Sequence, residues 1–429
     1  MATIAPFCAI RYNPGRLGHD VSRLIAPPYD VLDKAKKQAL LARNDRNIVA
    51  IDLPHTPPRQ AGPDRLYEQA GRRLQAWLAE GTLKQDDRPA IYLYQQRFQH
   101  RGQSYTRRMV LLRLRLEEFG RGSVFGHEQT FGGPKQDRLK LMQATRCNLS
   151  AVFGLFSDPN GQALSGLEPT GRKPDMSGRL EGVENLLWVL PEPSAMAGLQ
   201  QRLAERNIYI ADGHHRYATA LMYRDWLARR EGPLPAEHPA NFVLTAVCRM
   251  EDAGLLILPT HRVVKAAARI DPGQLQRAVR GYFEPADAPA SDPQQLAEAL
   301  NDLEPGSVAI VRPGGRPMVL RLVRRDVLDS LEPQRSQAWR RLGLAIVQRF
   351  LIEQVIAPRL AGAELEVLYS PDAGEAARLA EAADGLAVLV QPTGMDQLRA
   401  VCEAGELMPP KSTYFYPKLA TGLVINPLF

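Results

Sequence analysis

The stretch 207-NIYIADGHHRYATALMYRDW-226 decides how the central part of the chain folds. Ile208 and Ile210 alternate with other residue types, a period typical of a strand. Between residues 218 and 226, hydrophobic side chains recur instead at helical spacing. The two patterns predict a strand that passes directly into a helix, with DGHHR (residues 212–216) at the junction.

The composition of DGHHR points to bound anions. A structural interpretation makes Asp212 a helix N-cap and Gly213 a turn residue. It leaves His214, His215 and Arg216 unexplained, because positive side chains in a first helical turn oppose the helix dipole. A bound phosphate or carboxylate removes that conflict. We therefore predict catalytic roles for Asp212, His214 and His215, and phosphate binding by Gly213 and Arg216. The adjacent histidines lack the i, i+4 spacing of a helical metal site.

Length and composition indicate a globular protein of two or three domains. The chain has 429 residues, of which 45% are hydrophobic. No segment reaches the roughly 18 unbroken apolar residues of a membrane span, and no secretory leader is visible at the N-terminus. The four cysteines stand far apart without a CxxC pair, as in a reducing compartment. We expect a cytoplasmic protein without a membrane partner.

The net charge of +7 is unevenly distributed. Basic residues are in excess over residues 1–262, whereas residues 263–429 are mildly acidic. A basic N-terminal part suits a small anionic, phosphorylated ligand, although an ordinary solvated surface explains it equally well. The absence of any run of five basic residues argues against nucleic acid as a partner. The oligomeric state stays open.

Alternating elements along the chain predict a mixed α/β (α+β) fold in two domains, 1–262 and 263–429. Residues 91–98 and 104–119 predict a β-hairpin, and residues 308–315 and 317–325 predict a second one. A long helix is expected at 335–357, followed by alternating strands and helices. The second domain should therefore be a smaller α/β sandwich.

IAPPYDV (residues 25–31) is a turn stiffened by two prolines. Asp30 projects from it and is a candidate catalytic acid. A purely structural corner explains the motif about as well.

HEQTFGGPKQDRLKLMQATRCN (residues 127–148) predicts a flexible loop that leads into a helix. It lacks the Walker A pattern. His127 and Glu128 form a candidate base and its partner, and we assign Glu128 a catalytic role. As a cluster, the cations Lys135, Arg138 and Arg146 are predicted to bind phosphate. Each of them taken singly is more often a surface charge.

KSTYFYPK (residues 411–418) places three aromatic residues between two lysines. We predict that this segment folds back, so that Lys411, Ser412 or Lys418 reaches the phosphate site and the rings shield it. The alternative is that the aromatic residues only dock the tail to the core.

Several motifs together resemble one family. RYNP, IAPPYDV, HE...GPK.DRL, IADGHHRY.TAL, LPTHR and MPPKSTYFYPKL..GLVI are similar to the domain of unknown function family number 1015, from Arg11 to Ile425. Little about activity follows from that resemblance. Family genes often lie beside serine-biosynthesis genes, which implies serine or phosphoserine as a substrate.

The junction itself resembles the phosphate-binding box of the ParB/sulfiredoxin-like superfamily. That group includes sulfiredoxin, the nucleotide-binding domain of ParB proteins and free-serine kinases that use ADP or ATP. The resemblance implies a ParB/sulfiredoxin-like N-terminal core with a large insertion, and ATP or ADP with a divalent cation as cofactor. No metal ligands can be assigned. A histidine replaces the sulfiredoxin cysteine, which argues against peroxiredoxin repair.

These observations favour a nucleotide- or phosphate-dependent phosphotransferase or phosphohydrolase that acts on a small molecule. Phosphoryl transfer depends mainly on positioning and charge neutralisation, which converging His, Arg and Lys side chains supply. The alternative is a nucleotide-gated, ParB-like binding module without turnover. A nuclease is less favoured, because paired carboxylates for two metals are not evident.

Overall fold

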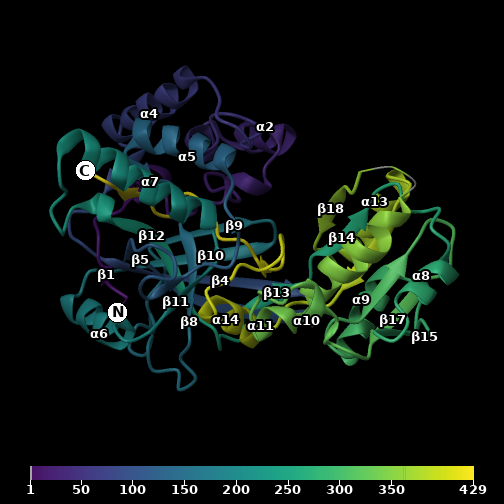
Figure 1. Ribbon diagram of the computed structural model, residues 1–429. Coiled ribbons are helices and arrows are strands. Elements are labelled where there is room, and N and C mark those ends of the chain that lie inside the picture. The colour runs from purple at the N-terminus through teal and green to yellow at the C-terminus, as the bar shows by residue number, and fades with distance from the viewer. Residues whose placement is uncertain (1, 361, 363) are drawn as a thin grey trace. The chain divides into compact units, whose positions relative to one another are not determined.

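The computed structural model describes residues 2–360, 362 and 364–429, and the chain forms two compact units (Figure 1). The first unit comprises Met1–Leu256 and Pro417–Phe429, and the second comprises Ile257–Tyr416. Each unit combines a β-sheet with helices, which confirms the mixed α/β prediction. A ParB/sulfiredoxin-like core stays a prediction.

Elements of the first unit are given in chain order. Its strands are β1 (Ile4–Ala5), β2 (Ile10–Tyr12), β3 (Leu83–Gln85), β4 (Ile91–His100), β5 (Gln103–Arg115), β6 (Val124–Phe125), β7 (Cys147–Asn148), β8 (Val152–Phe156), β9 (Met176–Leu180), β10 (Val183–Leu190), β11 (Ile208–Asp212), β12 (Phe242–Arg249) and β21 (Asn426–Pro427). Its helices are α1 (Pro14–Leu17), η1 (Tyr29–Val31), α2 (Lys34–Arg43), α3 (Val49–Asp52), α4 (Asp64–Ala79), α5 (Gly132–Thr145), α6 (Pro193–Leu203), α7 (His214–Glu231) and η2 (Pro239–Asn241).

A large mixed sheet forms the centre of the first unit. Its strand order is β6-β11-β8-β12-β5-β4-β10-β9, and β1 pairs with β5. The predicted hairpin is confirmed, because β4 and β5 pair antiparallel from Tyr92–Leu111 to His100–Gln103. β11 runs parallel to β6 and antiparallel to β8. The strand that leads into DGHHR therefore lies near one edge of the sheet.

Helices α4, α5 and α7 lie side by side (Figure 1). α7 turns a hydrophobic stripe toward the strands, and its buried members Tyr217, Ala220, Tyr223 and Leu227 recur every three or four residues. This spacing places them on one helical face, as burial against a sheet requires. The stripe fixes α7 against β8 and β12 and leaves its N-terminus beside the end of β11.

The C-terminal tail completes the first unit. Backbone hydrogen bonds join Ala26 to Thr421 and Ile10 to Ile425, with N–O distances of 2.8–3.1 Å. β21 pairs with β7. The last residues of the chain are therefore structural parts of the unit that contains DGHHR.

The second unit contains a six-stranded sheet of order β15-β17-β16-β19-β14-β18. Its strands are β13 (Leu256–Leu258, starting at the boundary), β14 (His261–Val264), β15 (Phe283–Ala286), β16 (Val308–Val311), β17 (Met318–Leu322), β18 (Val367–Ser370), β19 (Leu386–Val390) and β20 (Tyr414–Tyr416). Its helices are α8 (Pro272–Ala278), α9 (Pro293–Ala299), η3 (Leu300–Asp302), α10 (Val327–Leu331), α11 (Gln337–Arg340), α12 (Gly343–Ile346), η4 (Val347–Ile356), η5 (Ala357–Arg359), α13 (Ala373–Ala382) and α14 (Met395–Glu403). The predicted hairpin is confirmed as β16 and β17.

The expected long helix at 335–357 was wrong. α11 ends at Arg340, α12 begins at Gly343, and the chain continues as the π-helix η4. A Cβ at Gly343 would lie 2.7 Å from the Gly306 backbone, so this position packs directly against another backbone. That contact requires glycine, which is a poor helix former. The chain interrupts its helix at the point where Gly343 meets Gly306.

Candidate functional site

The predicted strand-to-helix junction is confirmed. β11 ends at Asp212 and α7 begins at His214, with Gly213 between them. Gly213 has a φ of 90°, which residues with a side chain rarely adopt. A Cβ here would also approach the Arg216 guanidinium to 2.9 Å. Glycine is therefore required both by the turn and by the placement of Arg216.

We expect Gly213→Ala to destabilise the fold by about 1–2 kcal/mol more than Gly81→Ala does, because it adds overpacking to backbone strain. Gly81 is a matched control, with a φ of 75° and its nearest non-neighbouring atom 3.7 Å from a built Cβ. Urea denaturation of both variants measures the difference. An equal loss of unfolding free energy in the two variants would show that the Arg216 side chain moves away from the added methyl group without cost.

Asp212 is the centre of a buried ion-paired cluster. Its Oδ1 accepts a 2.8 Å hydrogen bond from Lys418 Nζ, and its Oδ2 accepts a 2.5 Å bond from Arg216 Nη2. The side chains of Asp212, Lys418 and Arg216 are only 17%, 16% and 8% exposed. Burial disfavours the charged carboxylate, but Lys418 and Arg216 outweigh it and hold the pKa of Asp212 well below its ordinary value. The structure thus brings together three of the predicted site residues, one of them from the returning tail.

The neighbouring histidine pairs with an acid. His214 Nε2 accepts a 3.1 Å hydrogen bond from the backbone N–H of His127. Its Nδ1 lies 3.4 Å from Glu128 Oε2. Burial, reinforced by the nearby His214, lowers the pKa of His127 to about 3, so His127 is neutral at pH 7. Because Nε2 accepts a hydrogen bond, Nδ1 is the ring nitrogen that carries a proton, and it lies on the side of Glu128.

Two helix N-termini meet beside this pair. The ring of Phe131, the residue before α5, lies 6.0 Å from the ring of His215 in the first turn of α7. Lys135 is half-buried in the first turn of α5. The first N–H groups of a helix lack intrahelical partners and carry partial positive charge. The N-terminal ends of α5 and α7 therefore lie close to each other at the junction, an arrangement that suits an anion.

Asp30 and Arg138 lie at the proline turn (residues 25–31), which borders the Asp212 cluster on one side. Asp30 is exposed on η1 and forms no ion pair within the described part of the chain. Burial lowers the pKa of Arg216, but Asp212 and then Asp30 raise it above its ordinary value, so Asp30 is near Arg216. Arg138 is buried over the ring of Tyr29 at 4.1 Å and donates to Asp137 and Asp52. Its contacts tie the proline turn to α3 and α5.

One predicted phosphate ligand of the first unit, Arg146, lies apart from this cluster. Arg146 is exposed at the far end of α5, roughly 20 Å along the helix from its N-terminus, and lies 5.6 Å from the ring of Phe429. Lys411 and Ser412 belong to the second unit, where the buried Ser412 hydroxyl donates to Pro409 O. A role for Lys411 and Ser412 in phosphate binding stays a prediction.

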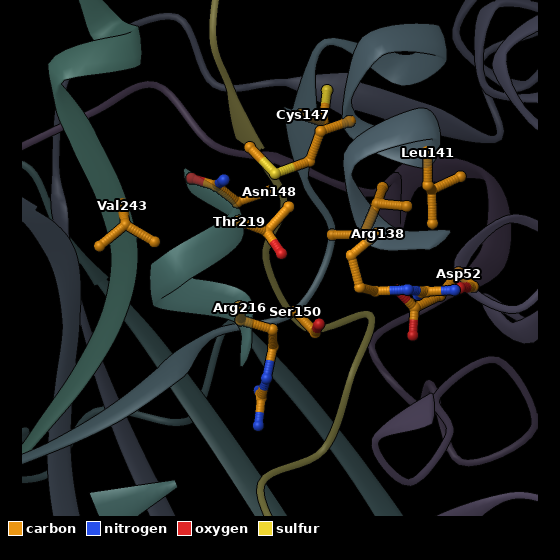
Figure 2. A pocket seen from close by; sticks show the side chains of 11 residues that line it. Asp52, Arg138, Leu141, Cys147, Asn148, Ser150, Arg216, Thr219 and Val243 are labelled. Atoms are coloured by element: carbon orange, nitrogen blue, oxygen red, sulfur yellow. The ribbon is translucent and has the colours of Figure 1, made fainter. Parts of the chain in front are cut away.

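A small cavity lies between α5, α7 and the sheet (Figure 2). Arg138 and Arg216 both line it, and Figure 2 shows the Arg138 guanidinium turned toward Asp52, away from Arg216. Its volume of about 30 Å³ accommodates one or two waters. A nucleotide or an amino acid does not fit in a cavity of this size.

One buried arginine and one buried acid near the site were missed by sequence reasoning. Arg107 is fully buried, and Asp212 is among the groups that act on it electrostatically. Arg107 lies in a strand with several arginines, which sequence patterns assign to the solvent-facing side. No feature of the sequence therefore distinguished Arg107 as buried. Asp52 ends a buried helical turn and carries no motif.

Two further findings concern metals and membranes. Across residues 2–360, 362 and 364–429, no group of three or more His, Cys, Asp or Glu side chains is arranged to hold a metal ion. Over the same residues, every helix is too short or too polar to cross a lipid bilayer.

The family described as "Protein of unknown function (DUF1015)" matches residues 4–344, and the chain belongs to it. The search of curated proteins found no match. Among solved structures, the chain is similar to "Free serine kinase in complex with AMP", with 14% identity and a TM-score of 0.33, over 72% of this chain and 90% of that one. The chain is also similar to a conserved hypothetical protein from Pyrococcus furiosus, with 13% identity and a TM-score of 0.32, over 72% of this chain and 94% of that one. A third similar structure is SbnI from Staphylococcus aureus, truncated at its C-terminus. It has 11% identity and a TM-score of 0.31, over 71% of this chain and 84% of that one. Scores this low establish neither activity nor ligand.

Proposed function

We propose that the first unit binds the phosphate of a small phosphorylated ligand at the N-termini of α5 and α7 and transfers or hydrolyses its phosphoryl group. The observation that carries the proposal is the meeting of these two N-termini beside the Asp212–Lys418–Arg216 cluster. Helix N-termini bind anions through free N–H groups and the dipole. Lys418 and Arg216 add two cationic side chains, the partners that phosphate oxygens prefer, around a single carboxylate.

In this proposal Asp212 acts by holding cations in place. Its two oxygens fix Lys418 and Arg216 in one orientation. Phosphoryl transfer needs such preset positive charge around the transferred group more than it needs covalent chemistry from the protein. Lys135, in the first turn of α5, would add a further cation.

Two acids compete for the role of general base. Asp30 is exposed on a rigid turn and is not ion-paired within the described residues, so its carboxylate is available to a substrate hydroxyl. Glu128 already faces His214, and its side chain is 28% exposed. We assign the base to Asp30 and give Glu128 and His214 the role of shaping the N-terminus of α7. His215, beside Phe131, would face the ligand.

The resemblance described above suggests serine or phosphoserine as the substrate, ATP or ADP as the nucleotide, and a divalent cation as helper. A cytoplasmic setting is consistent with the four cysteines, all of which are free thiols. The alternative, a nucleotide-gated binding module, would use the same phosphate site without turnover.

One experiment separates the two functions. Purified full-length protein is incubated with serine, Mg²⁺ and either ATP or ADP, and with phosphoserine alone, and the products are followed by ³¹P NMR. We expect phosphoserine to form from serine or inorganic phosphate to be released from phosphoserine. Nucleotide binding by calorimetry without any product would favour the binding module. Absence of both binding and turnover would contradict a phosphate site.

A further inference from the structure

A row of buried polar side chains crosses the centre of the large sheet. Arg107 of β5 is the register partner of Gln96 of β4, and Gln96 is the register partner of Asn185 of β10. Directly paired residues project from the same face of a sheet. All three are at most 1% exposed, as is Tyr94, two residues before Gln96 on the same face. A core sheet position normally carries a hydrophobic residue, so four polar side chains here need a reason.

The row holds the backbone of the returning tail. Arg107 Nη2 donates to Pro417 O, and Gln96 Nε2 donates to Lys418 O at 3.0 Å. The Ala420 N–H donates to the Tyr94 hydroxyl at 3.2 Å. Residues 417–420 are thus held through two carbonyls and one amide on the face of the sheet.

The side chains of the row also hold each other. Asn185 Oδ1 accepts from the Tyr94 hydroxyl at 2.6 Å and from Gln96 Nε2 at 3.1 Å. Arg107 Nη2 donates to Gln96 Oε1, and its guanidinium lies 4.9 Å from the centre of the Phe153 ring. Asn185 Nδ2 is fixed in turn by the carbonyls of Gly178 and Val183. A network of this kind favours one arrangement, because each broken bond leaves a buried polar group unsatisfied.

The held segment carries Lys418. Its backbone is fixed by Gln96, while its ammonium reaches Asp212 at 2.8 Å. The remainder of the tail is anchored elsewhere, through Thr421, Ile425 and β21. Those anchors use none of the side chains of the row. The row therefore acts on the position of Lys418 more than on the attachment of the tail.

We propose that this row, the tail clamp, positions Lys418 at the phosphate site; its members are Tyr94, Gln96, Arg107 and Asn185. They are positioning residues, since they act through Lys418 and touch neither Asp212 nor a substrate by their own hydrogen bonds. The catalytic relevance of the clamp rests on the proposed function. The positioning of Lys418 does not.

The test measures the reactivity of Lys418 without any ligand. Full-length wild type, Gln96→Met and Gln95→Met are labelled briefly with acetic anhydride, and acetylation of Lys418 is quantified by mass spectrometry. Gln95 is buried on the same strand but projects from the other face, so Gln95→Met matches the change in chemistry. We expect Lys418 to be acetylated about tenfold faster in Gln96→Met, in line with the loss of buried hydrogen bonds, and at the wild-type rate in Gln95→Met.

Equal labelling of Lys418 in wild type and folded Gln96→Met would overturn the proposal. If Gln96→Met does not fold, Tyr94→Phe decides, because it removes only the hydroxyl that receives Ala420 N–H and donates to Asn185. Faster labelling in Tyr94→Phe supports the clamp, and unchanged labelling overturns it.

A second readout links the clamp to catalysis. If the protein turns over, Gln96→Met should slow it about tenfold in the wild-type background and cause no further loss in a Lys418→Met background. Equal losses in both backgrounds would mean that the clamp does not act through Lys418. If the protein shows no turnover, the proposed function fails while the labelling result still decides the positioning.

Discussion

Replacing Asp212 with asparagine is expected to lower the free energy of unfolding by about 3–5 kcal/mol at pH 7, since it removes one partner of a buried ion-paired group. Lys418 and Arg216 would both lose their carboxylate while they remain buried. Urea denaturation gives the difference. Asp225→Asn is the matched control: its exposed carboxylate pairs with Arg224 on the same helix, and such surface pairs contribute about 0–1 kcal/mol.

The pH dependence of that difference checks its cause. The folded-state pKa of Asp212 is depressed, so the ionised carboxylate stabilises the fold fully above the unfolded-state pKa of about 3.9. The stabilisation is lost as the pH falls through the lower folded-state pKa. Wild type and Asp212→Asn should therefore differ by a constant amount from pH 7 to about pH 5 and converge below about pH 4. If the difference in unfolding free energy between wild type and Asp212→Asn does not decrease at acid pH, Asp212 stabilises the fold by packing instead of charge.

Local sequence patterns were sufficient for much of the fold. The β4–β5 hairpin and the β11–α7 junction were predicted because each depends on a hydrophobic period and a glycine that lie within a few residues. The prediction of one long helix over residues 335–357 was wrong, because the interruption of that helix depends on Gly306, more than 30 residues away in sequence. Sequence patterns report a residue's neighbours along the chain, whereas a backbone contact of this kind exists only after folding.

The same contrast holds for the site. The chemistry of DGHHR was visible because cations at a helix N-terminus conflict with its dipole. The structure adds that Asp212 satisfies Arg216 within one helical turn, and that Lys418 joins them from the tail. Taken singly, Arg138 has the pattern of a surface charge, yet it is buried and donates to the Asp137 carboxylate and to the Asp52 backbone carbonyl. Arg107 could not be recognised, because alternation along β5 does not reveal that the tail covers one face of the sheet.

The base assigned above predicts the largest change in rate. Asp30→Asn keeps the shape of the side chain but removes its ability to accept a proton, and positioned general bases contribute about 10²–10⁴-fold. Asp30 is exposed and forms no ion pair within the described residues, so its replacement should leave the fold nearly unchanged. Glu128→Gln should cost less, because the proposed role of Glu128, which lies 3.4 Å from His214 Nδ1, is to shape the N-terminus of α7 and not to take the proton.

The most direct measurement of the central claim is the turnover rate of Asp30→Asn under the conditions in which wild type forms or hydrolyses phosphoserine. Asp45→Asn is the control, because its carboxylate is 89% exposed and pairs only loosely with Arg46 at 3.9 Å. The account predicts a rate about 10²–10⁴-fold below wild type for Asp30→Asn, with unchanged nucleotide affinity, and a wild-type rate for Asp45→Asn. A wild-type rate for Asp30→Asn would contradict it, because the carboxylate assigned as the general base would then not take the proton.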